Sequence, residues 1–289
     1  MLNLLIRLTG RLPLRGAHAL GAALGRLAAG TDNRLRAAAQ ANIARCLPEW
    51  TVGQRRALRD QSMAECGRAA AEIGYLCHRP LDDVLGLVRE VTGEDAVQRL
   101  RSTGRGLVVA SPHLGAWELA GLYGSRRLPP MTIFHRPPRR PSLAALMGQC
   151  RTRTGARLVA DDPPGLRALY STLRAGGNVG LLPDQDPGRS GVFAPFFGLP
   201  ASTTTLVQRL LRATGAALVL CYAERLPRGE GYRVHFQPGP GDAGHEDPQR
   251  AAAALNAAVE ECARRLPAQY QWCYKRFKTR PEGEAEFYR

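Results

Sequence analysis

Lysine is nearly absent from this sequence: only Lys275 and Lys278 occur among 40 basic residues. Arginine therefore carries almost all of the positive charge, which exceeds that of the 25 acidic residues by 15. A guanidinium binds phosphates and carboxylates through a bidentate fork, so the surplus predicts an anionic partner: nucleic acid, an anionic membrane or an acidic protein. Genomic base composition can set the ratio of arginine to lysine, but it does not account for the net charge.

Paired cysteines and metal-binding histidines are also missing. The seven cysteines are scattered and odd in number, and none forms a CxxC pair. This pattern predicts buried thiols in a reducing compartment rather than a disulfide framework or a zinc site. The six histidines show neither HExxH nor HxH spacing, so we expect no metal and no cofactor.

Three catalytic signatures are absent as well. The chain has no GxSxG, no GxxxxGK[ST] and no GxGxxG after a strand. Their absence argues against a serine hydrolase, a P-loop enzyme and a dinucleotide-dependent enzyme. The chain still has 44% hydrophobic residues in 289, which is enough to bury the core of one large domain.

A long apolar run is the last absence, and it concerns the amino terminus. Residues 1–30 are rich in leucine but are interrupted by Arg7, Arg11, Arg15 and Arg26. A spanning helix needs about 20 consecutive apolar residues, and a signal peptide would not carry arginines in its apolar region. The composition favours a basic amphipathic segment in a membrane interface, split by Pro13. The alternative is an ordinary amphipathic helix packed on the domain.

The remaining chain divides by its periodicity. Residues 31–80 show helical spacing, with a cap candidate at Thr31 or Asp32. From about residue 86, short apolar runs such as GLVVA and NVGLL alternate with helical patterns. We therefore expect an α/β core over 81–289, a mixed central sheet flanked by helices, preceded by a helical part over 31–80 and a membrane-associated amphipathic segment over 1–30.

The stretch SPHLGAWEL at 111–119 follows the run GLVVA and contains His113 and Glu118. Positions five apart on one helix face in different directions, so these side chains can meet only across a strand–turn–helix junction. Pro112 and Gly115 suit such a turn, and the carboxyl end of a strand is where α/β sheets bind ligands. We expect the carboxylate to orient the imidazole as a base. A capping pair without catalytic function is the alternative.

Arginines follow two further elements. The turn HRPPRRP after the predicted strand MTIFH contains Arg136, Arg139 and Arg140. Arg151 and Arg153 precede Gly155 at the end of a predicted helix. Both groups are candidate anion sites, and a solvated loop explains the first of them equally well.

Carboxylates follow the strand NVGLL. Asp184 and Asp186 come directly after it, then Arg189, and then a stretch at 193–199 rich in phenylalanine and proline. Charge at one end and aromatic side chains at the other would suit an amphiphile with a polar head and an apolar tail. A structural turn with core phenylalanines is the alternative.

Several segments together resemble one family. SPHLGAWEL is similar to the HxxxxD/E motif of the lysophospholipid acyltransferase superfamily, in the glutamate form of its lipid A biosynthesis branch, the lauroyl/myristoyl acyltransferases. NRLRAAAQANIARCLPEW, HRPPRRP, LLPDQDPGRSGVFAPFFGLPA and LPAQYQWCYKRFKTRPEGE agree with that branch, and the matches span nearly the whole chain. The amino-terminal segment departs from it, because arginines interrupt the continuous apolar helix of the family.

The resemblance implies an acyltransferase at the cytoplasmic face of the inner membrane. It would move a fatty acyl chain from acyl carrier protein to a hydroxyl of an acylated, phosphorylated glucosamine disaccharide. His113 and Glu118 fall on the catalytic pair, and Asp184 and one arginine of the pair at 151 and 153 fall near further polar positions. With no nucleophile motif, we expect His113 to activate the acceptor hydroxyl directly, and the arginine-rich turns, including Arg136 and Arg189, to bind substrate.

Two alternatives stay open from the residues. Transfer to another lipid acceptor, a glycerophospholipid or an ornithine lipid, would use the same chemistry. A basic nucleic-acid-binding protein would account for the charge, but no binding motif and few aromatic residues accompany it, so we expect no nucleic acid among the partners.

Overall fold

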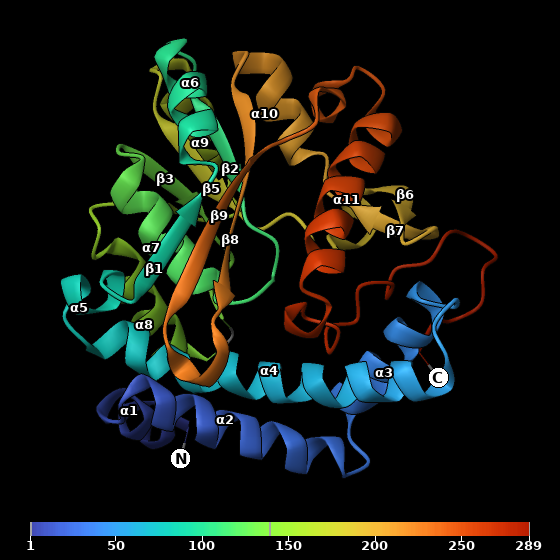
Figure 1. Cartoon of the computed structure of the whole chain (residues 1–289). Helices are drawn as coiled ribbons and strands as arrows, with labels where there is room; N and C mark the ends of the chain where they lie inside the picture. Colours follow the sequence, from blue (N-terminus) through green and yellow to red (C-terminus); the bar gives the residue numbers. More distant parts are fainter. Residues whose placement is uncertain (1, 139, 289) are drawn as a thin grey trace.

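The structure, a computed structural model, describes residues 2–138 and 140–288. A seven-stranded sheet lies on top of the long helix α4, and two amino-terminal helices lie beneath that helix (Figure 1). The helices are α1 Leu2–Arg11, α2 Leu14–Ala29, α3 Arg34–Cys46, α4 Val52–His78, α5 Leu81–Leu85, α6 Glu94–Ser102, α7 Trp117–Arg127, α8 Pro141–Thr152, α9 Pro163–Arg174, α10 Leu206–Thr214 and α11 Pro248–Arg265. The expected mixed sheet flanked by helices is confirmed.

The central sheet has the strand order β1-β9-β8-β2-β5-β3-β4, and all neighbouring strands run parallel except the antiparallel pair β8 and β9. The strands are β1 Val88–Thr92, β2 Leu107–Ala110, β3 Met131–Phe134, β4 Arg157–Val159, β5 Asn178–Leu181, β8 Ala217–Arg225 and β9 Tyr232–Pro238. Side chains alternate across each strand, so Leu107 and Val109 enter one apolar cluster with α7, while Val108 and Ala110 enter the other with α9 and α11.

The phenylalanine-rich stretch forms a separate hairpin of β6 Val192–Phe196 and β7 Leu199–Thr203. Phe196 and Phe197 are buried and contact the rings of Tyr270 and Trp272, respectively. The structural alternative for these two phenylalanines is therefore correct: they belong to the core, and they do not line a groove for an apolar tail.

The amino-terminal segment packs along α4. As expected, it is split at Pro13, between α1 and α2. Its glycines allow the helix backbones to touch: a Cβ at Gly21 would lie 2.4 Å from the carbonyl oxygen of Gly67, and one at Gly25 would lie 2.1 Å from that of Met63. No described helix has the length and apolar character needed to cross a membrane.

Local sequence accounts for the helix ends around α4. Asn33, rather than the expected Thr31 or Asp32, caps α3, since its side chain accepts hydrogen bonds from the backbone of residues 35 and 36. Thr51 and Gln54 form a capping box at the start of α4. The caps define where α3 and α4 begin. The carboxyl-terminal segment packs on α3, where Asn42 donates to the carbonyl oxygens of Trp272 and Tyr274.

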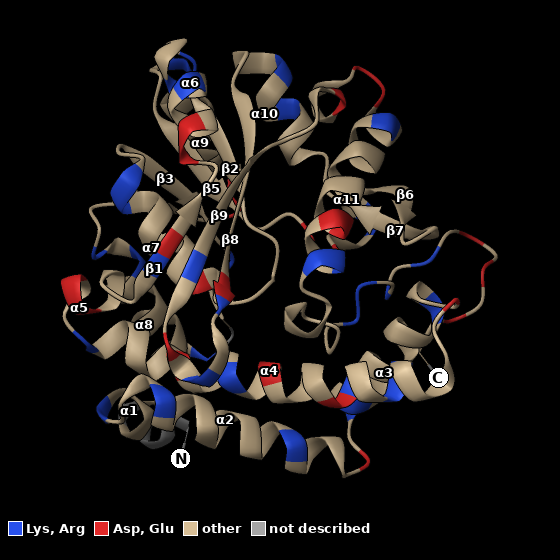
Figure 2. Cartoon of the chain, in the orientation of Figure 1, with Lys and Arg blue, Asp and Glu red and all other residues tan. Residues whose placement is uncertain are grey.

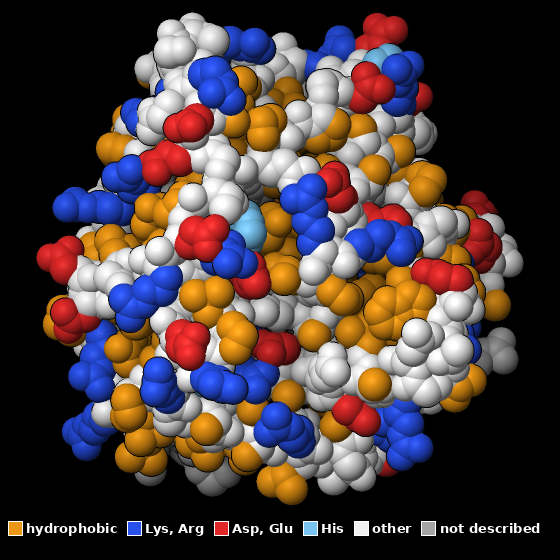
Figure 3. Space-filling view, in the orientation of Figure 1, with side chains coloured by type: hydrophobic (Ala, Val, Ile, Leu, Met, Phe, Trp, Pro, Cys, Tyr) orange, Lys and Arg blue, Asp and Glu red, His pale blue; other side chains and the backbone are white. Residues whose placement is uncertain are grey.

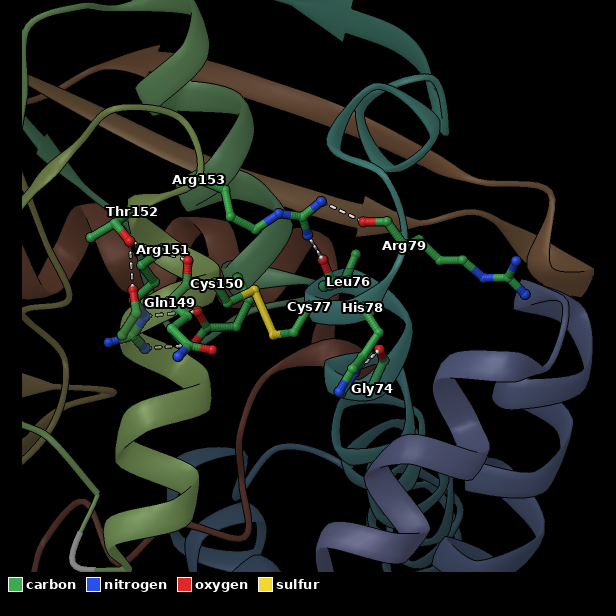
Figure 4. The surroundings of a disulfide bond; sticks show 12 residues. Gly74, Leu76, Cys77, His78, Arg79, Gln149, Cys150, Arg151, Thr152 and Arg153 are labelled. Atoms are coloured by element: carbon green, nitrogen blue, oxygen red, sulfur yellow. Dashed lines mark hydrogen bonds and ion pairs between the residues drawn. A yellow bond between two sulfur atoms is a disulfide. The ribbon is translucent and has the colours of Figure 1, made fainter.

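Cys77 of α4 and Cys150 of α8 form a disulfide, with their Cα atoms 4.9 Å apart (Figure 4). The prediction of free thiols is wrong for this pair. The two residues are 73 positions apart and carry no shared motif, so only the packing of α8 against the end of α4 brings them together. Cys66 of α4 lies close to Cys273 in the same manner, with 2.7 Å between the sulfur atoms.

Candidate active site

His113 lies in the loop between β2 and α7, so the expected strand–turn–helix junction is confirmed. The loop passes so close to β8 that a Cβ at Gly115, whose φ is +59°, would lie 2.0 Å from the carbonyl oxygen of Ala223. Only glycine fits this combination of space and left-handed backbone. Gly115 therefore sets the path that carries His113 past the carboxyl end of the sheet.

The partner of the imidazole is Asp184. Nδ1 of His113 lies 2.7 Å from one carboxylate oxygen, and the backbone N–H of His113 donates to the other at 2.9 Å. Asp184 follows β5, and β5 is hydrogen-bonded to β2, so the carboxyl ends of two neighbouring parallel strands bring the pair together. Among the described residues, Nε2 of His113 has no hydrogen-bond partner.

The Asp184 carboxylate stays ionised although it is only 4% exposed. Burial raises the pKa of Asp184, but the charge of the His113 imidazole and the two hydrogen bonds from His113 outweigh it and hold that pKa below its usual value. An ionised carboxylate only accepts hydrogen bonds, so Nδ1 must carry the imidazole proton. The neutral histidine is thereby left with Nε2 as its basic nitrogen.

Glu118 makes no hydrogen bond to His113 in the described structure, so the expected pairing of these two side chains is wrong. Its two oxygens accept from Nε and Nη2 of Arg151, at 2.9 and 2.6 Å. Glu118 sits in the first turn of α7 and points towards α8, where Arg151 ends the helix. Both side chains are largely buried, and a bidentate pair of this kind fixes the orientation of the guanidinium.

A cleft of about 400 Å³ opens beside His113. Arg136 and Arg151 line it together with Asp186, and so do Arg209 of α10 and Tyr274, which the sequence did not single out. Arg209 lies in an amphipathic helix whose pattern shows no more than an exposed cation, so no local signal distinguished it. The cleft thus gathers three arginines from three separate segments, and His135 lines it together with His113.

The other predicted arginines lie elsewhere. Arg153 donates to the backbone carbonyl oxygens of Leu76, at 2.6 Å, and of Arg79, so it ties α8 to the end of α4 (Figure 4). Arg189 is exposed in the 3-10 turn Gly188–Ser190 and does not line the cleft. Arg139 falls outside the described residues, and Arg140 is exposed at the start of α8.

Arg136 is exposed at the rim of the cleft and pairs with Asp161 at 3.0 Å. Ion pairs between exposed groups are weak and are screened by salt. The guanidinium of Arg136 can therefore exchange Asp161 for an anionic ligand at small cost.

The carboxyl-terminal segment completes the site. The backbone N–H of Gln271 donates to the carbonyl oxygen of His113 at 3.1 Å. Two residues of this segment hold Asp186. The backbone N–H of Asp186 donates to the hydroxyl of Tyr274 at 3.0 Å, and the Asp186 carboxylate accepts from the backbone N–H of Thr279 at 2.7 Å. The segment after α11 therefore contributes to one wall of the cleft, through Tyr274.

A buried ion pair supports the catalytic loop from behind. Glu72 of α4 accepts two hydrogen bonds from Arg225 of β8, at 2.9 and 2.6 Å, and the same guanidinium donates to the carbonyl oxygen of Gly115 at 2.7 Å. His18 of α2 and Tyr232 of β9 also contact the Glu72 carboxylate. Burial raises the pKa of Glu72, but the charge of Arg225 outweighs it and lowers that pKa to about 2.

The fold and the site together place a carboxylate-bound histidine beside a cleft at the carboxyl edge of an α/β sheet, an arrangement that is chemically able to act as a base. The family described as bacterial lipid A biosynthesis acyltransferase matches residues 1–279, and the chain belongs to that family.

Curated relatives agree with this assignment over most of the chain. The chain is 31% identical to the lipid A biosynthesis lauroyltransferase of Escherichia coli K12, over 94% of this chain and 89% of the relative. It is 30% identical to the palmitoleoyltransferase of the same strain, over 93% and 87%. It is 27% identical to the myristoyltransferase, over 93% and 83%.

Proposed function

We propose that this enzyme transfers a fatty acyl chain from acyl carrier protein to a hydroxyl of an acylated, phosphorylated glucosamine disaccharide, a precursor of lipid A. Membership of the family supports acyl transfer onto lipid A. The observation that carries the proposal is the environment of His113: its Nδ1 is bound to a buried carboxylate, and its Nε2, beside a cationic cleft, has no hydrogen-bond partner in the part of the chain that the structure describes.

The chemistry follows from that arrangement. Nε2 of His113 takes the proton of the acceptor hydroxyl while the hydroxyl oxygen bonds to the thioester carbonyl carbon. The tetrahedral intermediate then collapses, the carbon–sulfur bond breaks, and the leaving thiolate takes the proton back from the imidazolium. Asp184 orients the ring and stabilises its charged form. No serine, threonine or cysteine hydrogen-bonds to His113 among the described residues, which supports direct attack without an acyl-enzyme.

Cations of the cleft would bind the charged parts of the substrates. Arg151, fixed by Glu118, presents a guanidinium inside the cleft, while Arg136 and Arg209 do so nearer its rim. Phosphates on the disaccharide and the developing oxyanion are ligands of the kind that arginine binds well. In this proposal Glu118 acts through Arg151, and Asp184 takes the place beside the imidazole that the motif assigned to Glu118.

The amino-terminal helices provide a surface for an anionic membrane. Leu20, Leu24 and Leu27 of α2 share one helix face, are exposed, and are flanked by the exposed Arg15 and Arg26. A basic helix with an apolar exposed face binds the interface of an anionic bilayer. We therefore propose that the enzyme lies peripherally on the cytoplasmic face of the inner membrane, where its lipid acceptor is found.

The function is tested by the lipid A of a strain that lacks this gene. Mass spectrometry should show the loss of one secondary acyl chain, and complementation with the wild-type gene should restore it. An unchanged lipid A together with a changed glycerophospholipid or ornithine lipid would contradict the proposed acceptor.

The base is tested with purified protein. His113→Ala should lower kcat by about 10²–10⁴-fold, since a positioned base contributes about that factor, while the far-ultraviolet circular dichroism stays unchanged. Near wild-type transfer by this variant would exclude His113 as the base. A covalent acyl-enzyme trapped from the wild type would exclude direct attack.

A further inference from the structure

A narrow cavity of about 50 Å³ lies between α7 and the sheet, separate from the polar cleft. Its walls are almost wholly apolar on the sheet side, where strands β2, β3, β5 and β8 contribute Val109, Met131, Ile133, Leu181 and Cys221. On the helix side the residues are small: Ala120, Gly121 and Gly124. The cavity exists because α7 presents almost no side chain to this part of the sheet.

The cavity adjoins the reaction centre. Leu181 and Leu182 line both the cavity and the cleft that contains His113. Trp117, another wall residue, contacts the His113 ring with 5.4 Å between the ring centroids. From Trp117 the wall follows α7 to Gly124, about 10 Å along the helix axis at its usual rise per residue. The shape is that of a slot leading away from the base.

The glycines are not required by the fold. A Cβ at Gly121 would meet no atom within 4 Å, and one at Gly124 would meet only the sulfur of Cys221 at 3.9 Å. Glycine inside a helix is less stable than alanine, and an unfilled apolar cavity also costs stability. The chain therefore keeps a cavity that a single methyl group would fill favourably. A ligand that binds in the cavity would explain why it is not filled by a side chain.

One polar atom of the wall is unpartnered. The hydroxyl of Ser111, two residues before His113, is buried and has no hydrogen-bond partner in the described part of the chain. A buried hydroxyl without an acceptor is unfavourable. The carbonyl oxygen of a thioester, at the polar end of an acyl group, would supply that acceptor while the hydrocarbon continues into the apolar slot.

We infer that this cavity holds part of the acyl chain of the donor, and that Gly121 and Gly124 set the chain length that the enzyme accepts. The inference rests on the proposed function and deepens it. Relatives named for lauroyl, palmitoleoyl and myristoyl groups match the chain at similar identity, so family membership leaves the chain length open.

The test compares kcat/KM for a series of saturated acyl thioesters of graded length with one acceptor. One methylene in an apolar pocket changes kcat/KM by about 10–200-fold. Gly124→Ala and Gly121→Ala should therefore shift the ratio of long to short donors by about 10-fold or more towards the short ones, while Tm rises by about 2–4 °C. Gly148→Ala in α8 is the control, because a Cβ there also meets no described atom within 4 Å. It should raise Tm in the same way but leave the ratio of kcat/KM for long and short donors at the wild-type value.

The inference is overturned if both α7 variants keep the wild-type ratio, or if they slow all donors equally. It is also overturned if they change the dependence on the acyl chains of the acceptor instead of those of the donor. Calorimetric titration with free fatty acids of graded length makes the same comparison without turnover. A wild-type enzyme that transfers no acyl group would therefore refute the proposed function and still leave this binding measurement to decide on the cavity.

Discussion

At the scale of single residues, the hydrogen bond between His113 and Asp184 decides which imidazole nitrogen is basic, and the proposed mechanism depends on that choice. The ionised carboxylate accepts a hydrogen bond from Nδ1–H, which leaves Nε2 as the basic nitrogen of the imidazole beside the cleft. The pKa of Asp184 lies below its usual value because of the charge and hydrogen bonds of His113, so the carboxylate is ionised at neutral pH and accepts this hydrogen bond. A histidine without this partner could adopt either tautomer and rotate freely.

Asp184→Asn should lower kcat by up to about 10⁴-fold, because an amide can stabilise the wrong imidazole tautomer. Glu118→Gln should instead raise KM for the phosphorylated acceptor more than it lowers kcat, since it loosens Arg151 without touching the imidazole. Steady-state kinetics of both variants separate the two roles. A larger fall in kcat for Glu118→Gln than for Asp184→Asn would return Glu118 to the position beside the base.

At the scale of elements, Glu72 connects four pieces of the fold. Its carboxylate joins α2, α4, β8 and β9 through His18, Arg225 and Tyr232, and Arg225 extends the connection to the catalytic loop at Gly115. A buried carboxylate is costly to leave unpaired, and so is its partner. The loop that carries His113 is therefore held by a charge pair that α4 contributes from outside the sheet.

Glu72→Gln should lower the free energy of unfolding by up to about 3–5 kcal/mol, because it removes the bidentate partner of the buried Arg225 and leaves only Glu65, at 3.3 Å, as a counter-charge. The Glu72→Met and Arg225→Met double variant should recover most of that loss, since apolar side chains can replace a buried pair. Chemical denaturation measures both. Equal loss in the single and double variants would show that the pair contributes through its specific hydrogen bonds.

The same pair predicts a dependence on pH. The pKa of Glu72 falls from 4.5 to about 2 on folding, so its stabilising effect is complete above pH 4.5 and is lost as the pH drops towards 2. Unfolding of the wild type should therefore become easier across that window, and Glu72→Gln should show a flatter dependence there.

At the scale of the whole molecule, the amino-terminal helices define one face. Of the large apolar side chains that the described structure leaves exposed, all but Phe193 lie between residues 8 and 52. Orange apolar side chains alternate with blue basic ones along the lower edge in Figure 3, where Figure 2 places α1 and α2 with several arginines and no acidic residue on either helix. If the proposed membrane contact is correct, apolar and cationic groups on this one side would orient the molecule at an anionic bilayer.

The double variant Leu24→Asp and Leu27→Asp should abolish cosedimentation with vesicles that contain anionic phospholipid, because two carboxylates oppose both the apolar and the electrostatic attraction. The control is Phe193→Asp, a single substitution of the same kind at an exposed apolar residue of the β6–β7 hairpin. It should bind these vesicles as the wild type does. Undiminished binding of the double variant would place the membrane contact elsewhere.

Much of the architecture could be predicted from the sequence, because short apolar runs and helical spacing report local structure. The junction at His113 followed from that pattern. The partner of His113 did not, because it depends on β5 lying next to β2, and strand order is set by packing across the whole sheet. The resemblance placed Asp184 near the site and paired Glu118 with His113. The structure instead pairs Asp184 with His113 and Glu118 with Arg151.

Some signals were present in the sequence and were not used. Arg151 and Arg153 are two positions apart, which on a helix places their side chains about 200° apart, so only one could face the cleft. Gly10, Gly21 and Gly25 lie in a leucine-rich segment, where small residues indicate close contact with another helix. The disulfide and the position of Arg209 had no such signal, since each depends on contacts between distant segments.

The wall formed by the carboxyl-terminal segment has a consequence for how the enzyme is made. His113 is synthesised long before Gln271, Tyr274 and Thr279, yet these late residues hold its carbonyl oxygen and Asp186 in place. A nascent chain can form much of the sheet without possessing a complete cleft. We therefore expect the proposed acyl transfer to begin only after residues 271–279 have been synthesised and have packed against the loop of His113.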